Sequence, residues 1–235
     1  MSASQRIEET VSTYRHSTVF DASTEYTKRF QHTTNEANYY KVLERLVKRD
    51  VLGKLDKGVY YIPKRSQYGT LLPRDEHIVK AFMPKPTDGM EIGYGLYQKH
   101  GLTTQVAKRR VFYTNQLNQN QKRVSHMVFH RKDIRFTKPV KQLVELLEVL
   151  QHFSLIEDLN YPSFMTFAQR VAKTYNDATL ATILKTINHK KSTLAFLAEV
   201  LDAFGIPHCV QERLSTLSQY RIPKWRHRDD FTSLT

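Results

Sequence analysis

The chain has 235 residues, of which 40% are hydrophobic and 11% aromatic, enough apolar material for the core of one large domain or two ordinary ones. This composition excludes global disorder. The 36 basic and 23 acidic residues give a net charge of +13, for which a polyanion such as nucleic acid is the simplest partner. The only cysteine, Cys209, excludes an intramolecular disulfide and a thiolate metal cluster. The polar N-terminus and the lack of a long apolar run predict a cytoplasmic protein without membrane contact.

The first segment, residues 1–65, predicts a fixed order of helices and strands. Helices are expected over 6–15 and 22–30, with a short strand over 18–20 between them. After a polar tetrad, a third helix is expected to run to Asp50, with Thr34 as its N-cap.

The third predicted helix is followed by a hairpin. Its apolar face is formed by Leu43, Leu46 and Val47, which recur at helical spacing. Extended runs over 51–55 and 59–62 are joined through a turn sequence, Asp56-Lys57-Gly58, and Pro63 ends the second strand. Helix, helix, turn, helix and hairpin is the order of a winged helix-turn-helix, a DNA-binding module.

The remaining residues predict a larger body over 66–235. Residues 66–137 form its mixed α/β part, with helices expected over 74–82 and 94–100 and strands over 90–92, 110–114, 127–130 and 134–136. Residues 138–235 form its helical part, with helices expected over 140–152, 162–175, 178–188, 192–204 and 207–217, and Gly205 capping the fourth. The predicted fold class is therefore α+β: an N-terminal winged helix-turn-helix domain over 1–65, a mixed α/β segment and a helical C-terminal region.

Polar and cationic side chains occupy the side of the third helix that faces away from its apolar stripe. This face is formed by Asn35, Asn38, Lys41, Arg45 and Lys48. Amide side chains pair bidentately with adenine, and Lys or Arg reach guanine edges or phosphates. We therefore assign Asn35, Asn38 and Lys41 to base edges, and Arg45 and Lys48 to the DNA backbone.

Further contacts with the DNA backbone are expected around this helix. Thr33, Thr34 and the N–H groups at the helix start suit phosphate, because that end carries partial positive charge. Lys54 and Lys57 on the hairpin are the wing residues expected to touch phosphate or the minor groove. The alternative for Lys41, Arg45 and Lys48 is a solvated helix face without a partner.

A second basic cluster, Lys108-Arg109-Arg110, precedes a predicted strand. It either extends the phosphate footprint beyond the wing or keeps an edge strand from pairing with other chains.

The sequence offers little for catalysis or cofactor binding, and we predict no enzyme, metal or cofactor. His126 and His130 fall in a strand-like run, where the spacing places them too far apart for one metal ion. The pairs Glu145/Glu148 and Asp229/Asp230 resemble the paired carboxylates of nucleases. Charged neighbours of this kind are more often solvated.

Three runs of residues resemble one known family. They are Leu43-Glu44-Arg45-Leu46-Val47-Lys48-Arg49-Asp50-Val51-Leu52, Gly58-Val59-Tyr60-Tyr61-Ile62-Pro63-Lys64 and Gly101-Leu102-Thr103-Thr104-Gln105-Val106. Together they resemble the AbiEi-type antitoxins of bacterial type IV toxin-antitoxin systems, over roughly residues 18–136. A purely structural alternative is that the third run ends a helix, with Gly101 in a left-handed conformation.

The resemblance implies a transcriptional autorepressor that binds operator DNA, with inverted repeats in its own promoter. It also implies an antitoxin against a nucleotidyltransferase-like toxin, in a family known from phage abortive infection. By the resemblance, the DNA-binding residues are Thr34, Asn35, Asn38, Lys41 and Arg45, with Gly58 at the wing turn. Two alternatives are a module that neutralises a toxin without specific DNA binding and a nuclease with a winged-helix targeting domain.

Overall fold

The protein has a mixed α+β fold with a helical C-terminal region. The computed structural model describes residues 2–215 and 217–225. They form two compact units: the first contains residues up to 90 together with 111–133, and the second contains 91–110 and the described residues from 134 onward. The chain crosses from one unit to the other within strands β6 (Gly89–Ile92) and β7 (Arg110–Thr114).

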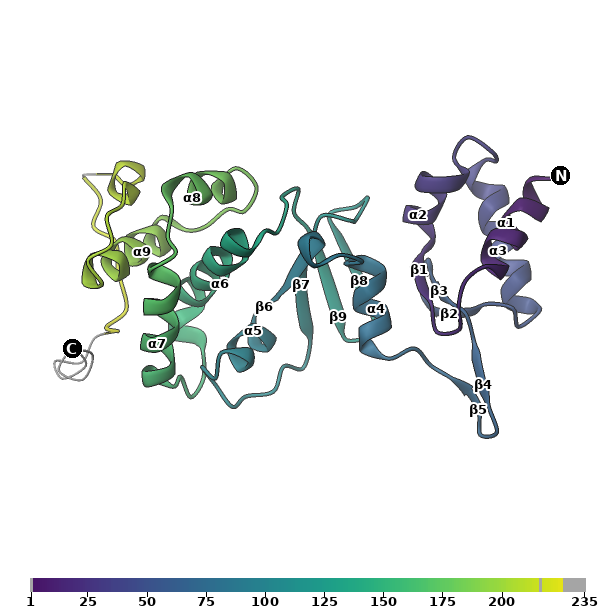
Figure 1. Cartoon of the computed structure of the whole chain (residues 1–235), viewed down its shortest axis with the longest axis horizontal. Coiled ribbons are helices and arrows are strands. Elements are labelled where there is room, and N and C mark those ends of the chain that lie inside the picture. Colours follow the sequence, from purple (N-terminus) through teal and green to yellow (C-terminus); the bar gives the residue numbers. More distant parts are fainter. Residues whose placement is uncertain (1, 216, 226–235) are drawn as a thin grey trace. The chain divides into compact units, whose positions relative to one another are not determined.

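The first unit begins with three helical segments and a small sheet (Figure 1). In chain order these are α1 (Ala3–Ser12), β1 (Val19–Asp21), α2 (Ala22–Glu25) continued by the π-helical turn η1 (Tyr26–Phe30), α3 (Glu36–Lys48), β2 (Gly53–Asp56) and β3 (Val59–Tyr61). The three strands pair antiparallel in the order β1-β3-β2. The predicted order of elements and the turn at Gly58, with φ +70°, are confirmed.

Two helix starts differ from the prediction. Helix α1 begins at Ala3 rather than residue 6, because Ser2 and Gln5 form a reciprocal capping box. The prediction that Thr34 caps α3 is wrong. The N-cap is Asn35, whose side chain accepts a hydrogen bond from the Asn38 N–H at 2.9 Å.

The structure contains strands that the sequence analysis missed. A hairpin of β4 (Lys64–Ser66) and β5 (Gly69–Leu71) follows β3 directly, where Pro63 was expected to end the extended run. Strand β8 (Gln121–Val124) pairs with β9 (Met127–Arg131), which places His126 in the turn between them. The strand expected over 134–136 is wrong, because this segment forms no ladder and only buries Ile134 and Phe136.

The two helices of the mixed part match the prediction closely. They are α4 (Asp75–Phe82) and α5 (Tyr94–Lys99), and a 3₁₀ turn η2 (Pro86–Asp88), which was not predicted, lies between them. A four-stranded sheet runs in the order β6-β7-β9-β8.

The helical C-terminal region contains α6 (Lys138–His152), α7 (Tyr161–Ala172), α8 (Asp177–Leu184) and α9 (Lys191–Ala203), with a 3₁₀ turn η3 (Phe153–Leu155) after α6. Gly205, at φ +65°, ends α9 as predicted. The helix expected over 207–217 is wrong for the described part, which has only the 3₁₀ turn η4 (Val210–Arg213). Side chains of Asp177 and His208 accept the N–H groups of Cys209 and Val210, which replaces helical hydrogen bonds there; residue 216 lies outside the described residues. Within the described residues, no helix has the length and apolar character needed to cross a membrane.

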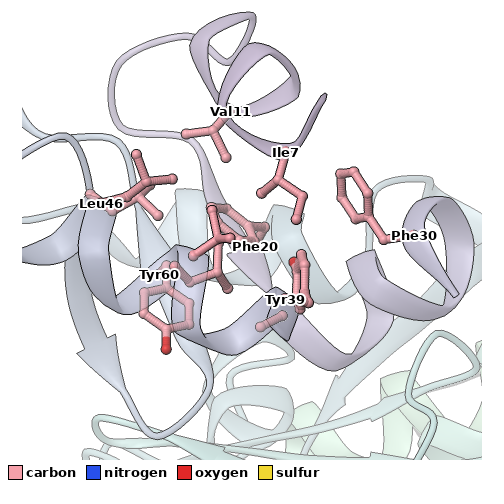
Figure 2. Close-up of a cluster of buried hydrophobic side chains, with 11 residues drawn as sticks. Ile7, Val11, Phe20, Phe30, Tyr39, Leu46 and Tyr60 are labelled. Atoms are coloured by element: carbon pink, nitrogen blue, oxygen red, sulfur yellow. The ribbon is translucent and has the colours of Figure 1, made fainter. Parts of the chain in front are cut away.

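Two apolar clusters hold the first unit together. Figure 2 shows side chains of one cluster, in which Ile7 from α1, Phe20 from β1 and Phe30 converge on Tyr39 of α3. The other cluster joins β1 and β3 to α4 and to the β7–β9 strands, through residues that include Val19, Val59, Tyr61, Phe82, Phe112 and Phe129. The domain boundary that we expected after residue 65 therefore falls inside one compact unit.

Replacing Tyr39 tests the first cluster. The side chain is 1% exposed, and its ring stacks on Phe30 with centroids 5.2 Å apart. We expect Tyr39→Ala to lower the free energy of unfolding by about 3–5 kcal/mol, because it leaves a cavity in an aromatic core. Urea unfolding followed by circular dichroism measures the change. The exposed neighbour Lys41→Ala is the control, expected within about 0.5 kcal/mol of wild type; a loss below about 1 kcal/mol for Tyr39→Ala would contradict the packing.

Candidate nucleic-acid interface

Helix α3 buries one side and exposes the other. Tyr39, Leu43 and Leu46 are 1% exposed or less and face the core. The opposite side carries exposed polar and cationic side chains, which are Asn38, Lys41, Arg45 and Lys48. Because these residues recur every three or four positions, they form one stripe along the helix. The stripe was predicted from the sequence, and we call it the α3 cationic face.

The start of α3 is more occupied than the sequence indicated. The Oδ1 atom of Asn35 holds the helix cap, whereas bidentate pairing with adenine needs both the oxygen and the nitrogen of the amide. This geometry favours Asn38 over Asn35 for such a contact.

The two threonines before the cap are only partly exposed. The N–H groups of Thr33 and Thr34 donate to the Phe30 carbonyl at 2.8 and 3.0 Å. Since an α-helix leaves its first N–H groups without an internal partner, those of Glu36 and Ala37 are better placed for phosphate.

The β2–β3 hairpin presents its lysines but not its turn. The side chains of Lys54 and Lys57 are exposed. The turn atoms contact the protein itself: the Gly58 carbonyl accepts from the Ala22 N–H at 2.9 Å, and the Lys57 carbonyl accepts from Lys122 Nζ at 3.0 Å. This hairpin is therefore docked on the rest of the first unit.

A buried ion pair fixes that docking. Lys122 on β8 lies 2.9 Å from the Asp21 carboxylate, and the two side chains are 12% and 6% exposed. Asp21 also caps α2 by accepting the Thr24 N–H. Removing one partner of a buried pair costs about 3–5 kcal/mol, so this contact is a strong link between β8 and the N-terminal sheet.

The three residues of the basic cluster at the start of β7 differ in their surroundings. The Arg110 guanidinium forms two parallel hydrogen bonds to Glu91, each 2.8 Å long, so its assignment as a phosphate contact is not supported by its geometry. Lys108 and Arg109 are exposed. They belong to the second unit, whereas α3 belongs to the first.

The run from Gly101 to Val106 follows the end of a helix, as the structural alternative predicted. Gly101 has φ +65°, and the N–H groups of Gly101 and Leu102 donate back to α5 at 2.9 and 2.8 Å. Beyond the cap, the buried Thr103 hydroxyl donates to the Glu157 carbonyl at 2.7 Å, and the Gln105 amide donates to Asp158. The run thus ties the end of α5 to the segment before α7.

The paired carboxylates of α6 are not solvated, which corrects the sequence-based expectation. Glu145 is 7% exposed and accepts from Lys99 at 2.8 Å and from His100 at 3.0 Å. Glu148 is 4% exposed and lies 3.3 Å from His152. Lys and His side chains of the protein itself contact both carboxylates, which argues against metal-dependent nuclease chemistry at this pair.

Two other kinds of enzyme site were considered from the sequence. The second carboxylate pair, Asp229 and Asp230, lies outside the described residues. No group of three or more metal-ligating side chains is found in the part of the chain that the structure describes.

Sequence reasoning missed two exposed cations in the first unit. Lys64 and Arg65 lie on β4 of the second hairpin. The signal that could have found them is the run Ser66-Gln67-Tyr68-Gly69, a turn sequence between two short extended runs.

A sequence profile described as a family of unknown function, DUF6088, matches residues 6–145. The match covers more than half of the chain, and the protein belongs to this family. No curated protein matches the chain. A similar solved structure is the crystal structure of the RV2827C protein from Mycobacterium tuberculosis, at 12% sequence identity and a TM-score of 0.43, covering 96% of this chain and 86% of that one.

The Glu145 cluster predicts a pH dependence. Burial alone would raise the pKa of the Glu145 carboxyl, but hydrogen bonds from His100 and Lys99 outweigh it and hold the pKa below its ordinary value of 4.5. The ionised Glu145 therefore stabilises the folded state at pH values above the ordinary pKa of 4.5. This contribution is lost as the pH falls through the lowered pKa of the folded state. We expect Glu145→Gln to destabilise the protein at neutral pH and to have a smaller effect at acidic pH, measured by urea unfolding across the range.

The control is the exposed Glu157→Gln, which we expect to have little effect at either pH. A cost of Glu145→Gln that does not change between neutral and acidic pH would contradict the ion-pair assignment.

Proposed function

We propose that the N-terminal part of the chain is a winged helix-turn-helix that binds duplex DNA, with α3 in the major groove. The α3 cationic face carries this proposal, because it is exposed along the helix while the opposite side is buried. A polar and cationic surface of this kind suits both base edges and phosphates.

The arrangement around α3 supports the same proposal. The element order α1, β1, α2, α3, β2, β3 and the sheet order β1-β3-β2 place α3 after a tight polar turn and before a hairpin. Recognition helices of this type present their N-terminal residues to base edges. In this geometry Asn38 and Lys41 read bases, while Arg45 and Lys48 contact the DNA backbone.

The biological role that we propose is transcriptional autorepression by a cytoplasmic antitoxin. It follows the resemblance of the runs at 43–52, 58–64 and 101–106 to AbiEi-type antitoxins. The operator is expected to contain inverted repeats, which bind two copies because half-site spacing must match a two-fold arrangement. The counterpart is a nucleotidyltransferase-like toxin. A module that neutralises the toxin without specific DNA binding is the alternative, and the DNA experiment separates the two.

Substitution on α3 tests DNA binding. The probe is a duplex selected by the full chain from a random-sequence library, and binding is followed by fluorescence anisotropy. We expect Asn38→Ala/Arg45→Ala to weaken binding by at least about tenfold, because each base or phosphate contact contributes about 1–3 kcal/mol. Affinity of the wild type should also fall steeply with added salt.

The control is Lys80→Ala, an exposed cation on α4 of the same unit. We expect it to bind within about twofold of wild type, since isolated surface charges contribute little. Failure of the full chain to enrich any sequence, or unchanged binding by the double variant, would overturn the assignment of α3.

Co-expression tests the antitoxin role. The reading frame adjacent to this gene is expressed alone and together with the chain, and growth is measured. We expect the adjacent protein to arrest growth and the chain to restore it. If the adjacent protein is harmless, or if growth stays arrested, the antitoxin role is excluded while the DNA-binding role stands.

A further inference from the structure

The turn that a wing would use on DNA is occupied in the β2–β3 hairpin. The Asp56 carboxylate accepts from the Ser125 N–H at 3.3 Å, and Leu55 packs against an apolar cluster. With the contacts of Lys57 and Gly58 described above, the backbone of the turn is held against β8–β9 and the start of α2, while the Lys57 side chain stays exposed. A hairpin held in this way has little freedom to adjust its backbone to the flank of a bound duplex.

The β4–β5 hairpin has the opposite character. Among the strands that the structure describes, β4 and β5 pair only with each other, in the register Lys64↔Leu71, Arg65↔Thr70 and Ser66↔Gly69. Figure 1 shows the hairpin extending away from the three-stranded sheet that precedes it. The tip is closed locally, since Ser66 Oγ donates to the Gly69 carbonyl at 2.9 Å and Gly69 adopts φ +109°.

The exposed side chains of this hairpin include cationic and apolar ones beside the polar Gln67 and Thr70. Tyr68 at the tip is 89% exposed, Leu72 just after β5 is 69% exposed, and Lys64 and Arg65 are exposed on β4. A two-stranded hairpin is marginally stable in water, so an exposed aromatic ring at its tip and exposed leucines at its base favour a partner that covers them.

The charge around the hairpin identifies the partner. Residues 57–74 contain four basic side chains and no acidic one. An uninterrupted cationic segment matches the phosphate backbone. Arginine together with an apolar or aromatic side chain is the combination that proteins insert into the minor groove.

We propose that the β4–β5 hairpin, and not β2–β3, is the wing of this protein, with Arg65 and Tyr68 entering the minor groove beside the major groove occupied by α3. This inference rests on the proposed function. Arg65 contacts the groove floor and walls, Lys64 contacts phosphate, and the docked β2–β3 hairpin supports the sheet. Lys54 and Lys57 then contribute only to the surrounding positive field.

The first experiment compares two matched pairs of charge removals on the selected duplex. Lys64→Ala/Arg65→Ala is expected to weaken binding by about tenfold. Lys80→Ala/Lys85→Ala removes the same charge from exposed sites in the same unit and is expected to bind within about twofold of wild type. Equal losses for both pairs, or no loss for the hairpin pair, overturn the wing assignment.

The second experiment identifies the groove. Diaminopurine in place of adenine adds an amino group to the minor groove and leaves the major-groove pattern of the thymine pair usable. Placed in the flanks of the selected site, it should weaken wild-type binding and leave the already weakened Lys64→Ala/Arg65→Ala variant unchanged. An identical effect on both proteins overturns minor-groove insertion.

Two results separate this inference from the proposed function. If Asn38→Ala/Arg45→Ala abolishes binding while the hairpin variant binds like wild type, α3 is the recognition helix and only the wing assignment fails. Sedimentation of the free proteins tests whether the hairpin instead contacts a second copy of the chain. If the wild type is a dimer and the hairpin variant is a monomer, β4–β5 is a dimer contact and the inference is overturned.

Discussion

Burial of one side of α3 is the constraint on which the rest of the first unit depends. Tyr39 lies among Phe30, Tyr26 and Tyr40 with centroid distances of 5.2 to 5.5 Å. Burying an aromatic side chain of this size stabilises by about 4–6 kcal/mol, whereas an exposed ion pair contributes less than about 1 kcal/mol. Aromatic packing therefore sets the rotation of α3 about its axis. The cationic residues of α3 face solvent because the opposite side of the helix is buried in the core.

A second contact determines how far this unit extends along the sequence. The buried pair of Asp21 and Lys122 joins residues 101 positions apart, and the apolar cluster around Phe112 and Phe129 closes over the same sheet. The β2–β3 hairpin does not end this unit, because it is packed against later strands. The family match from residue 6 to 145 spans this whole arrangement, consistent with a unit that needs the later strands.

Local patterns in the sequence were sufficient to predict α3 and β2–β3, because helical periodicity and a turn with a glycine are encoded within a few residues. The cap was misplaced because Thr34 and Asn35 are both good caps, and the Phe30 carbonyl, which takes the Thr34 N–H, decides between them. The β4–β5 hairpin was missed because Pro63 was taken as the end of all extended structure. Pairings between distant residues, such as Arg110 with Glu91 and Glu145 with His100, leave no local signal at all.

Net charge by itself therefore does not locate a nucleic-acid surface in this chain. The segment 66–137 has 12 basic and 5 acidic residues, a net charge of +7. Several of its cations hold carboxylates of the same chain: Lys99 holds Glu145, Arg110 holds Glu91 and Lys122 holds Asp21. A cation that neutralises an internal carboxylate cannot release counterions from DNA without leaving a buried charge unpaired. If the chain binds a duplex as proposed, the positive field comes from exposed stripes such as the α3 cationic face. The position of acidic partners decides which lysines and arginines contribute to that field.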